Sequence, residues 1–356
     1  MANQKNRIDA FDIAKGIGIL LVVIGHSFTE GKISNFIYSF HMALFFVVSG
    51  LLISETGSMD RRRKHAVRKF LGNNLMVSYI LWSVIYVVFY VVVRFAILNE
   101  VGKAEVIWAV YKTLTLYGIG VLWFLPTLLI SRTVAVRVRF AFNRSAIFVV
   151  ILAMISLFGL CVSPYVELLN QSGIIKILYY PASVILRSLV MTIFIGVGCL
   201  SKPYILKIRN FNRGGVCFTS GILLLAITWI VSQISTRADI HALRFGNPFL
   251  FIIAGFLGSY GILLVSVGIE RINKIKDSFV FLGVNSLLIM VTHENFMIKN
   301  LLNYLFRSLG FDMTHVAPKL IVLTLLMITE IGLCLVLRDP VDRVTLSIKR
   351  KLGVDK

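Results

Sequence analysis

Long runs of hydrophobic residues alternate with short, mostly basic segments along almost the whole chain. Each run is close to the ~20 residues that an α-helix needs to cross the hydrocarbon core of a bilayer. Because backbone polar groups inside that core must bond to one another, the runs predict helices. We expect about ten transmembrane helices, near residues 8–28, 38–55, 74–96, 121–136, 146–166, 180–200, 216–236, 248–269, 279–297 and 316–337.

The predicted fold class is an all-α, polytopic bundle of membrane helices. One segment, EVIWAVYKTLTLYGIG at 105–120, fits this scheme poorly. An extra span, a re-entrant piece and an interfacial helix remain open for it, and Glu105 and Lys112 favour the last two. No internal repeat, low-complexity linker or soluble segment is evident in the sequence. We therefore expect a single integral-membrane domain over residues 1–356, with no separate soluble domain.

Composition and charge agree with a membrane protein. The chain is 57% hydrophobic and only 15% charged, with a mean hydropathy of +0.84. Basic clusters lie at 61–69, 132–144, 202–213, 271–276 and from 338 onward, between alternate runs. Because cytoplasmic loops are enriched in Lys and Arg, both termini are expected in the cytoplasm, and the net charge of +20 is assigned to orientation rather than nucleic-acid binding. The charged N-terminus does not resemble a signal peptide, so no cleaved leader is expected.

The first run, FDIAKGIGILLVVIGHS, carries three ionisable residues. Lys15 and His26 are 11 positions apart, within about 20° of three full turns, so they share one helix face. Asp12 lies three residues before Lys15, on the same side, and can pair with it. Ionisable groups inside a span are typically functional; the alternative is an Asp–Lys anchor near the interface with His26 capping the outer end. Asp12, Lys15 and His26 are the candidate catalytic residues.

Other polar and aromatic residues of the hydrophobic runs are candidates for substrate binding. They are His41, Arg187, Asn285, Ser286, His293, Glu294 and Trp123. His41 is expected at the depth of His26, and Arg187 requires a counter-charge or an anionic ligand. For the others, interfacial solvation, helix packing and an aromatic belt remain open alternatives. Equal depth also predicts an ion pair between Lys15 and Glu330.

Two opening stretches carry a family resemblance. RIDAFDIAKGIGILLVVIGHS followed by FHMALFFVVSGLLI resembles the start of the membrane-bound acyltransferase family 3, within it the fucose O-acetylase-like branch that modifies bacterial polysaccharides. LWFLPTLLISR, ILRSLVMTIFIGVGCL and FLGVNSLLIMVTHENF agree with it. In that family a basic residue, usually Arg, precedes the catalytic His at the spacing seen between Lys15 and His26. Lys15 is a point charge and cannot make the bidentate contact that Arg makes.

The resemblance implies an integral-membrane O-acyltransferase of the bacterial cell membrane. It would transfer acetyl from cytoplasmic acetyl-CoA, the acyl-donor cosubstrate, to a hydroxyl of a cell-envelope or capsular polysaccharide sugar. His26 would act as general base or as acyl carrier, and the two remain open. Arg61, Arg62 and Arg63 are candidates to bind the CoA phosphates, with a purely topological role as the alternative.

The expected partners are the lipid bilayer and a glycan or lipid-linked glycan acceptor. No metal and no nucleic acid are expected, and the sequence leaves the oligomeric state unknown. The competing function is a non-enzymatic transporter or flippase of a lipid-linked sugar. Transporters of that kind often contain repeated halves, and the lack of a sequence repeat favours the enzyme.

Overall fold

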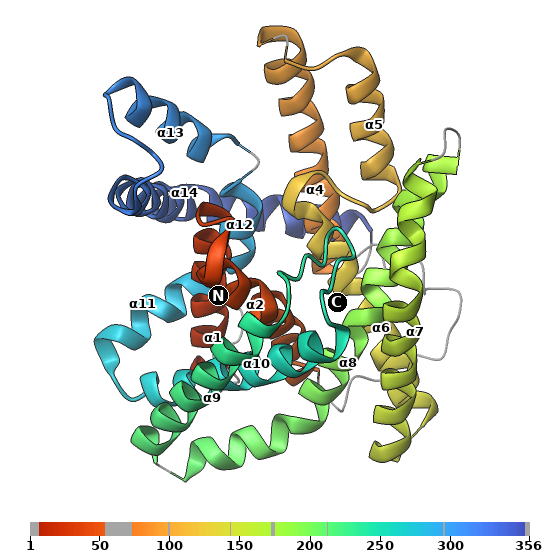
Figure 1. The fold of residues 1–356 in the computed structure, drawn as a ribbon, viewed down its shortest axis with the longest axis vertical. Coiled ribbons are helices and arrows are strands. Elements are labelled where there is room, and N and C mark those ends of the chain that lie inside the picture. The colour runs from red at the N-terminus through yellow and green to blue at the C-terminus, as the bar shows by residue number, and fades with distance from the viewer. Residues whose placement is uncertain are drawn as a thin grey trace. The chain divides into compact units, whose positions relative to one another are not determined.

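The helices of this chain follow one another with short connections. A computed structural model describes residues 7–53, 73–98, 100–142, 144–171, 175–211, 213–294 and 296–352. The elements, labelled in Figure 1, are α1 (Asp9–Ser27), α2 (Gly31–Leu51), α4 (Asn74–Phe89), the π-helix η3 (Tyr90–Ile97), α5 (Lys103–Leu114), the 3-10 helix η4 (Gly120–Trp123), α6 (Phe124–Ala141), α7 (Ser145–Gln171), α8 (Lys176–Asn210), α9 (Gly214–Ile234), α10 (Pro248–Ile269), α11 (Asn273–Val284), α12 (Ser286–Thr292), α13 (Ile298–Ser308) and α14 (Val316–Lys351).

Most of these helices are long enough to cross a membrane. Within the described residues, nine helices meet the length and hydropathy of a span, or ten if the bent pair α11 and α12 counts as one. The described residues form no strand, only an isolated bridge between Asp239 and Arg244. The prediction of an all-α, polytopic membrane bundle with about ten spans is therefore confirmed. The cytoplasmic placement of both termini stays a prediction.

The predicted ninth span, 279–297, corresponds to a bent pair of helices, α11 and α12. The chain bends by 58° between α11 and α12. Asn285 lies at the break, and its side-chain Nδ2 donates a hydrogen bond of 2.8 Å to the Phe281 carbonyl oxygen. The Asn285 backbone N–H donates to the same carbonyl oxygen at 3.2 Å, so the side chain and the backbone share one acceptor at the end of α11. Two residues earlier, Gly283 is so close to α1 that a Cβ atom would lie 1.8 Å from the Asp12 carbonyl oxygen, which fixes where α11 packs.

The uncertain segment 105–120 is not an extra span. It contains α5, whose 12 residues are too few to cross a bilayer. Left-handed backbone at Leu116 (φ 62°) and Gly118 (φ 81°) follows the helix and turns the chain. The second helix already begins at Gly31 rather than near residue 38, and the short helix α13 was not expected.

The chain divides into two compact units, which we describe separately. Unit 1 comprises Met1–Ser54, Ser131–Pro164 and Leu189–Leu287; unit 2 comprises Glu55–Ile130, Tyr165–Ser188 and Leu288–Lys356.

Unit 1 is built around α1, with α2, α10 and α11 packed against it and α9 alongside α10. Glycines permit the close approach: a Cβ on Gly258 of α10 would meet the Phe40 ring of α2 at 2.2 Å, and one on Gly50 would meet the Ile195 carbonyl oxygen at 2.2 Å. Small residues at helix contacts are the usual means of tight packing in membranes, where no hydrophobic force drives helices together. Helix α1, which carries Asp12, Lys15 and His26 on one face, is thus closely packed in its unit.

Unit 2 joins its segments mainly through aromatic rings and hydroxyls. The Tyr79 hydroxyl of α4 donates to the Thr113 carbonyl oxygen of α5 at 2.7 Å, and the two helices stand side by side in Figure 1. The Phe296 ring lies 5.3 Å from the ring of Tyr86 and 5.4 Å from that of Phe89. These contacts bring the α12–α13 connection against the end of α4.

Candidate functional site

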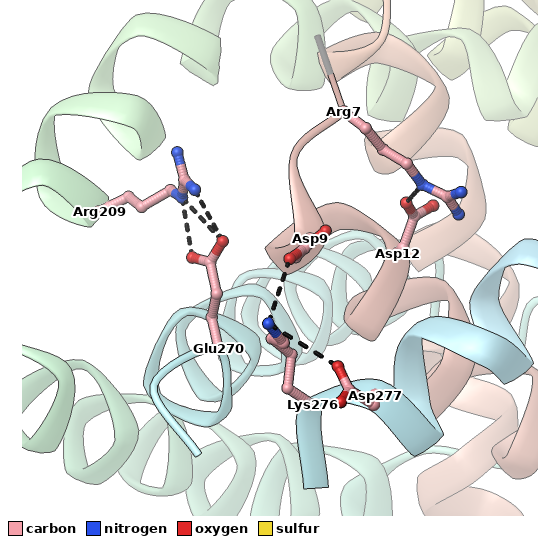
Figure 2. Close-up of polar contacts among 7 residues, drawn as sticks. All are labelled: Arg7, Asp9, Asp12, Arg209, Glu270, Lys276 and Asp277. Atoms are coloured by element: carbon pink, nitrogen blue, oxygen red, sulfur yellow. Dashed lines mark hydrogen bonds and ion pairs between the residues drawn. The ribbon is translucent and has the colours of Figure 1, made fainter. Parts of the chain in front are cut away.

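Asp12 is the centre of an ion-pair group near the start of α1. The residue is 5% exposed, and its Oδ1 lies 2.6 Å from Lys15 Nζ, as the spacing of three residues predicts. The second oxygen, Oδ2, accepts from Arg7 Nε (Figure 2). Asp12 also lies in the first turn, where a negative charge is stabilised by the helix dipole. The predicted Asp12–Lys15 pair is therefore confirmed.

Further ion pairs surround this end of α1 (Figure 2). Lys276 Nζ lies 3.8 Å from Asp9 and 3.7 Å from Asp277. The Arg209 guanidinium donates hydrogen bonds of 2.8–3.1 Å to both carboxylate oxygens of Glu270. Bidentate Arg–carboxylate pairs have a fixed geometry that single-point contacts lack. Cations and carboxylates alternate here, so this end of α1 is a network of paired charges.

At the other end of α1, two histidines lie beside one tyrosine. The centre of the Tyr38 ring lies 6.4 Å from the centre of the His26 ring and 4.9 Å from the centre of the His41 ring. His41 is buried, and its Nδ1 is 2.7 Å from the Ile37 carbonyl oxygen. Because a carbonyl only accepts, Nδ1 of a neutral His41 carries the proton and Nε2 is the acceptor.

Arg237 completes this group. Its guanidinium carbon lies 3.7 Å from the centre of the Tyr38 ring, and its Nη1 donates to the Thr29 carbonyl oxygen. A cation stacked on a tyrosine face is held by the ring quadrupole. Sequence reasoning missed both residues. The spacing of Tyr38 and His41, three positions on one helix, could have found Tyr38; nothing local marks Arg237, which follows α9.

Arg187 of unit 2 lies in an aromatic enclosure. It is 0% exposed, its Nε donates to the Ser183 carbonyl oxygen at 3.2 Å, and its guanidinium carbon lies 4.6 Å and 5.3 Å from the rings of Tyr117 and Trp123. These two π faces partly stabilise the buried cation. Burial raises the pKa of the Tyr117 hydroxyl, so Tyr117 stays a neutral phenol beside Arg187. Trp123 thus has a packing partner, and its predicted substrate role stays a prediction.

Unit 2 also contains a pocket of about 240 Å³. Its wall combines aromatic, amide and charged side chains with two segments of irregular backbone. The lining residues are Tyr86, Phe89, Tyr90, Arg94, Ile119, Gly120, Glu294, Met297 and Asn300. Of the predicted binding residues, Glu294 is in this wall; Tyr86, Tyr90, Arg94 and Asn300 were missed, because they are ordinary aromatic and polar residues from segments far apart in sequence.

The local backbone of this pocket is unusual. Tyr90 and Arg94 belong to the π-helix η3, a conformation frequent at functional sites. Gly120 (φ 52°) and Met297 (φ 60°) have left-handed backbone, which for a methionine is a strained state that the surroundings must hold in place. The Arg94 guanidinium lies 5.2 Å from the Tyr90 ring, and its Nε is 3.1 Å from Glu100. The positive charge facing the pocket is therefore already paired.

The remaining predicted residues have structural partners. Asn285 caps the end of α11 and Ser286 starts α12. His293 is 1% exposed, and its Nδ1 contacts the carbonyl oxygens of Ile289 (3.0 Å) and Met290 (2.9 Å). Glu330 is fully buried and accepts a hydrogen bond from the Thr292 hydroxyl. The Lys15–Glu330 ion pair stays a prediction, and Arg61, Arg62 and Arg63 lie outside the described residues.

Fold and site together define an integral membrane protein whose first helix carries a buried acid, a cation and an imidazole. Its family is identified by comparison: the acyltransferase domain model matches residues 8–338. The chain therefore belongs to the membrane-bound acyltransferase family 3, which consists of acyltransferases. No curated protein and no solved structure matches the chain.

Proposed function

We propose that this acyltransferase transfers an acetyl group from acetyl-CoA to a hydroxyl of a cell-envelope sugar, in the cell membrane of a bacterium. The observation that carries the proposal is the position of His26 on α1, beside Tyr38 and on the helix that also holds the Asp12–Lys15 pair. Acyl transfer to a hydroxyl requires a base with a pKa near neutrality, and imidazole is the side chain that supplies one.

In the proposed step, His26 takes the proton of the sugar hydroxyl while the hydroxyl oxygen attacks the thioester carbonyl carbon. The new C–O ester bond forms, the C–S bond breaks, and the proton passes from the imidazole to the departing CoA sulfur. A covalent acetyl-imidazole would divide the same transfer into two steps. In both routes one nitrogen of His26 must be unprotonated at the start of the reaction.

The Asp12–Lys15 pair supports a role in positioning the donor. Lys15 is one cation, and Asp12 neutralises much of its charge, so its remaining hydrogen bonds suit one phosphate or carboxylate oxygen. The side chain of Lys15 is 24% exposed and can reach such a group. The partial exposure of Lys15 favours a contact with the acyl donor over a purely structural anchor.

The pocket of unit 2 is the proposed binding site for the acceptor sugar. Tyr86, Phe89 and Tyr90 supply apolar and aromatic surface for a sugar ring, and Asn300 and Glu294 supply groups that bond hydroxyls. Because Arg94 is paired with Glu100, the wall has no surplus positive charge. An uncharged sugar fits this balance better than a uronic acid or a sugar phosphate.

The competing function is transport of a lipid-linked sugar without acylation. Labelled acetyl-CoA added to membranes that contain the chain separates the two. If the chain is the proposed enzyme, label should enter the glycan fraction as an alkali-labile ester, in proportion to the amount of chain present. A transporter predicts movement of the sugar with no ester label, and that result would overturn the proposed function.

A further inference from the structure

Two lysines of unit 2 converge on one group of aromatic rings. Lys112 Nζ, near the end of α5, lies 5.4 Å from the centre of the Tyr180 ring. Lys176 Nζ, at the start of α8, lies 5.8 Å from the centre of the Trp108 ring. The Trp108 and Tyr180 rings are themselves 5.6 Å apart, so both ammonium groups lie against a single ring pair.

The geometry of this group is fixed by a third ring. Tyr111 lies 5.7 Å from Trp108 and 5.9 Å from Tyr180, and its hydroxyl donates to the Ile177 carbonyl oxygen at 2.8 Å. That bond ties α5 to the first turn of α8. The positions of the two lysines relative to each other therefore follow from the packing of the helices rather than from free side-chain motion.

Charge is unbalanced at this place. Among the described residues, no Asp or Glu forms an ion pair with either lysine. Burial lowers the pKa of Lys112, and the charge of Lys176 lowers it further. Lys176 also begins α8, where the positive end of the helix dipole disfavours a cation and attracts an anion. Two cations and a helix start together favour a bound negative group.

The surroundings indicate that this negative group belongs to a lipid. Lys176 is the first residue of a helix long enough to span the membrane. Trp and Tyr side chains are enriched at the level at which lipid headgroups lie. Exposed apolar side chains flank the lysines: Leu114 is 76% and Leu178 58% exposed. Apolar surface beside two neighbouring cations fits an acyl chain beside a phosphate.

We propose that Lys112 and Lys176, on the Trp108–Tyr111–Tyr180 platform, bind the phosphate of an anionic membrane lipid. The two ammonium groups contact the phosphate oxygens, the start of α8 adds backbone N–H groups, and the exposed leucines contact the acyl chains. This binding site is separate from the acyl-transfer chemistry, so it stands or fails independently of the proposed function.

Native mass spectrometry of the purified full chain tests this site by titration with phosphatidylglycerol, with phosphatidylcholine and with inorganic phosphate. We expect the first phosphatidylglycerol molecule to bind more tightly than phosphatidylcholine. Lys112→Gln and Lys176→Gln should each weaken the binding of phosphatidylglycerol roughly 5-fold, because one lysine contributes ~1 kcal/mol near an anionic headgroup. The double Lys→Gln variant should lose roughly 25-fold.

Two controls separate charge from folding. Lys103→Gln removes an exposed lysine from the other end of α5 and should leave binding unchanged. The double Lys→Arg variant keeps both charges and should retain the preference for phosphatidylglycerol. The proposal is overturned if the double Lys→Gln variant keeps that preference, if the double Lys→Arg variant loses it equally, or if inorganic phosphate alone displaces the lipid.

Discussion

Lys15 and Asp12 are bound to each other across one turn of α1, with 2.6 Å between Nζ and Oδ1. This pair places a charged contact on the helix that carries His26, and Arg7 bonds the second oxygen of the same carboxylate. Asp12 is therefore the acceptor for two cations at once. Its removal would leave both cations without their partner.

Replacing Asp12 tests this relationship. Asp12→Asn should lower the free energy of unfolding by roughly 1–3 kcal/mol, because two charge-assisted hydrogen bonds lose their anionic acceptor. Lys15→Arg should keep the ion pair and most of the stability. Thermal unfolding in detergent, monitored as the loss of soluble protein, measures the stability of both variants. Equal unfolding temperatures for Asp12→Asn and the wild type would contradict the account.

The contact between α1 and α11 gives a prediction about packing. A Cβ at Gly283 would lie 1.8 Å from the Asp12 carbonyl oxygen, whereas one at Gly332 of α14 has no described atom within 4 Å. Gly283→Ala should destabilise the chain by roughly 1–3 kcal/mol through overpacking. Gly332→Ala should be neutral or stabilising, because alanine favours helix by about 1 kcal/mol. Thermal unfolding should therefore occur at a lower temperature in Gly283→Ala but not in Gly332→Ala.

The enclosure of Arg187 predicts which replacements are tolerated. Trp123→Phe keeps a ring for the guanidinium and should stay near wild-type stability. Trp123→Leu removes the π face and should cost about 0.5–2 kcal/mol. Arg187→Lys should be destabilising as well, because an ammonium lacks the planar surface that stacks on aromatic rings. If Trp123→Leu were as stable as Trp123→Phe, the cation–π contact would contribute nothing.

The acceptor pocket predicts a kinetic difference between two asparagines of α13. Asn300 lines the pocket, and Asn303, one turn later, is not part of the wall. Losing one hydrogen bond of about 0.5–1.5 kcal/mol should raise the KM for the sugar roughly 2- to 12-fold in Asn300→Ala, with little change in the KM for the acyl donor. Asn303→Ala is the matched control. A KM change in the control variant alone would place the sugar elsewhere.

Local periodicity accounts for what the sequence predicted well. The spans are set by continuous hydrophobic runs, and the shared face of Asp12 and Lys15 follows from helical spacing alone. These features depend only on residues near one another in the chain. The ion pair was predictable for that reason.

Tertiary contacts account for what was missed. Gly283 packs against α1 in a contact between segments 271 residues apart, which no local pattern displays. Arg237 reaches Tyr38 from the loop after α9, and the pocket of unit 2 assembles from three separate stretches. Ordinary tyrosines and asparagines become site residues only through such contacts.

The proposed function assigns the acyl transfer to His26. The direct measurement is the rate of acetyl transfer from labelled acetyl-CoA to the glycan, in membranes holding equal amounts of wild type, His26→Ala or His315→Ala. His315 is the matched control, because its side chain is 74% exposed beyond the spanning helices. We predict that His26→Ala loses at least the ~100-fold that a general base contributes, while His315→Ala keeps the full rate. Full transfer by His26→Ala would contradict the account.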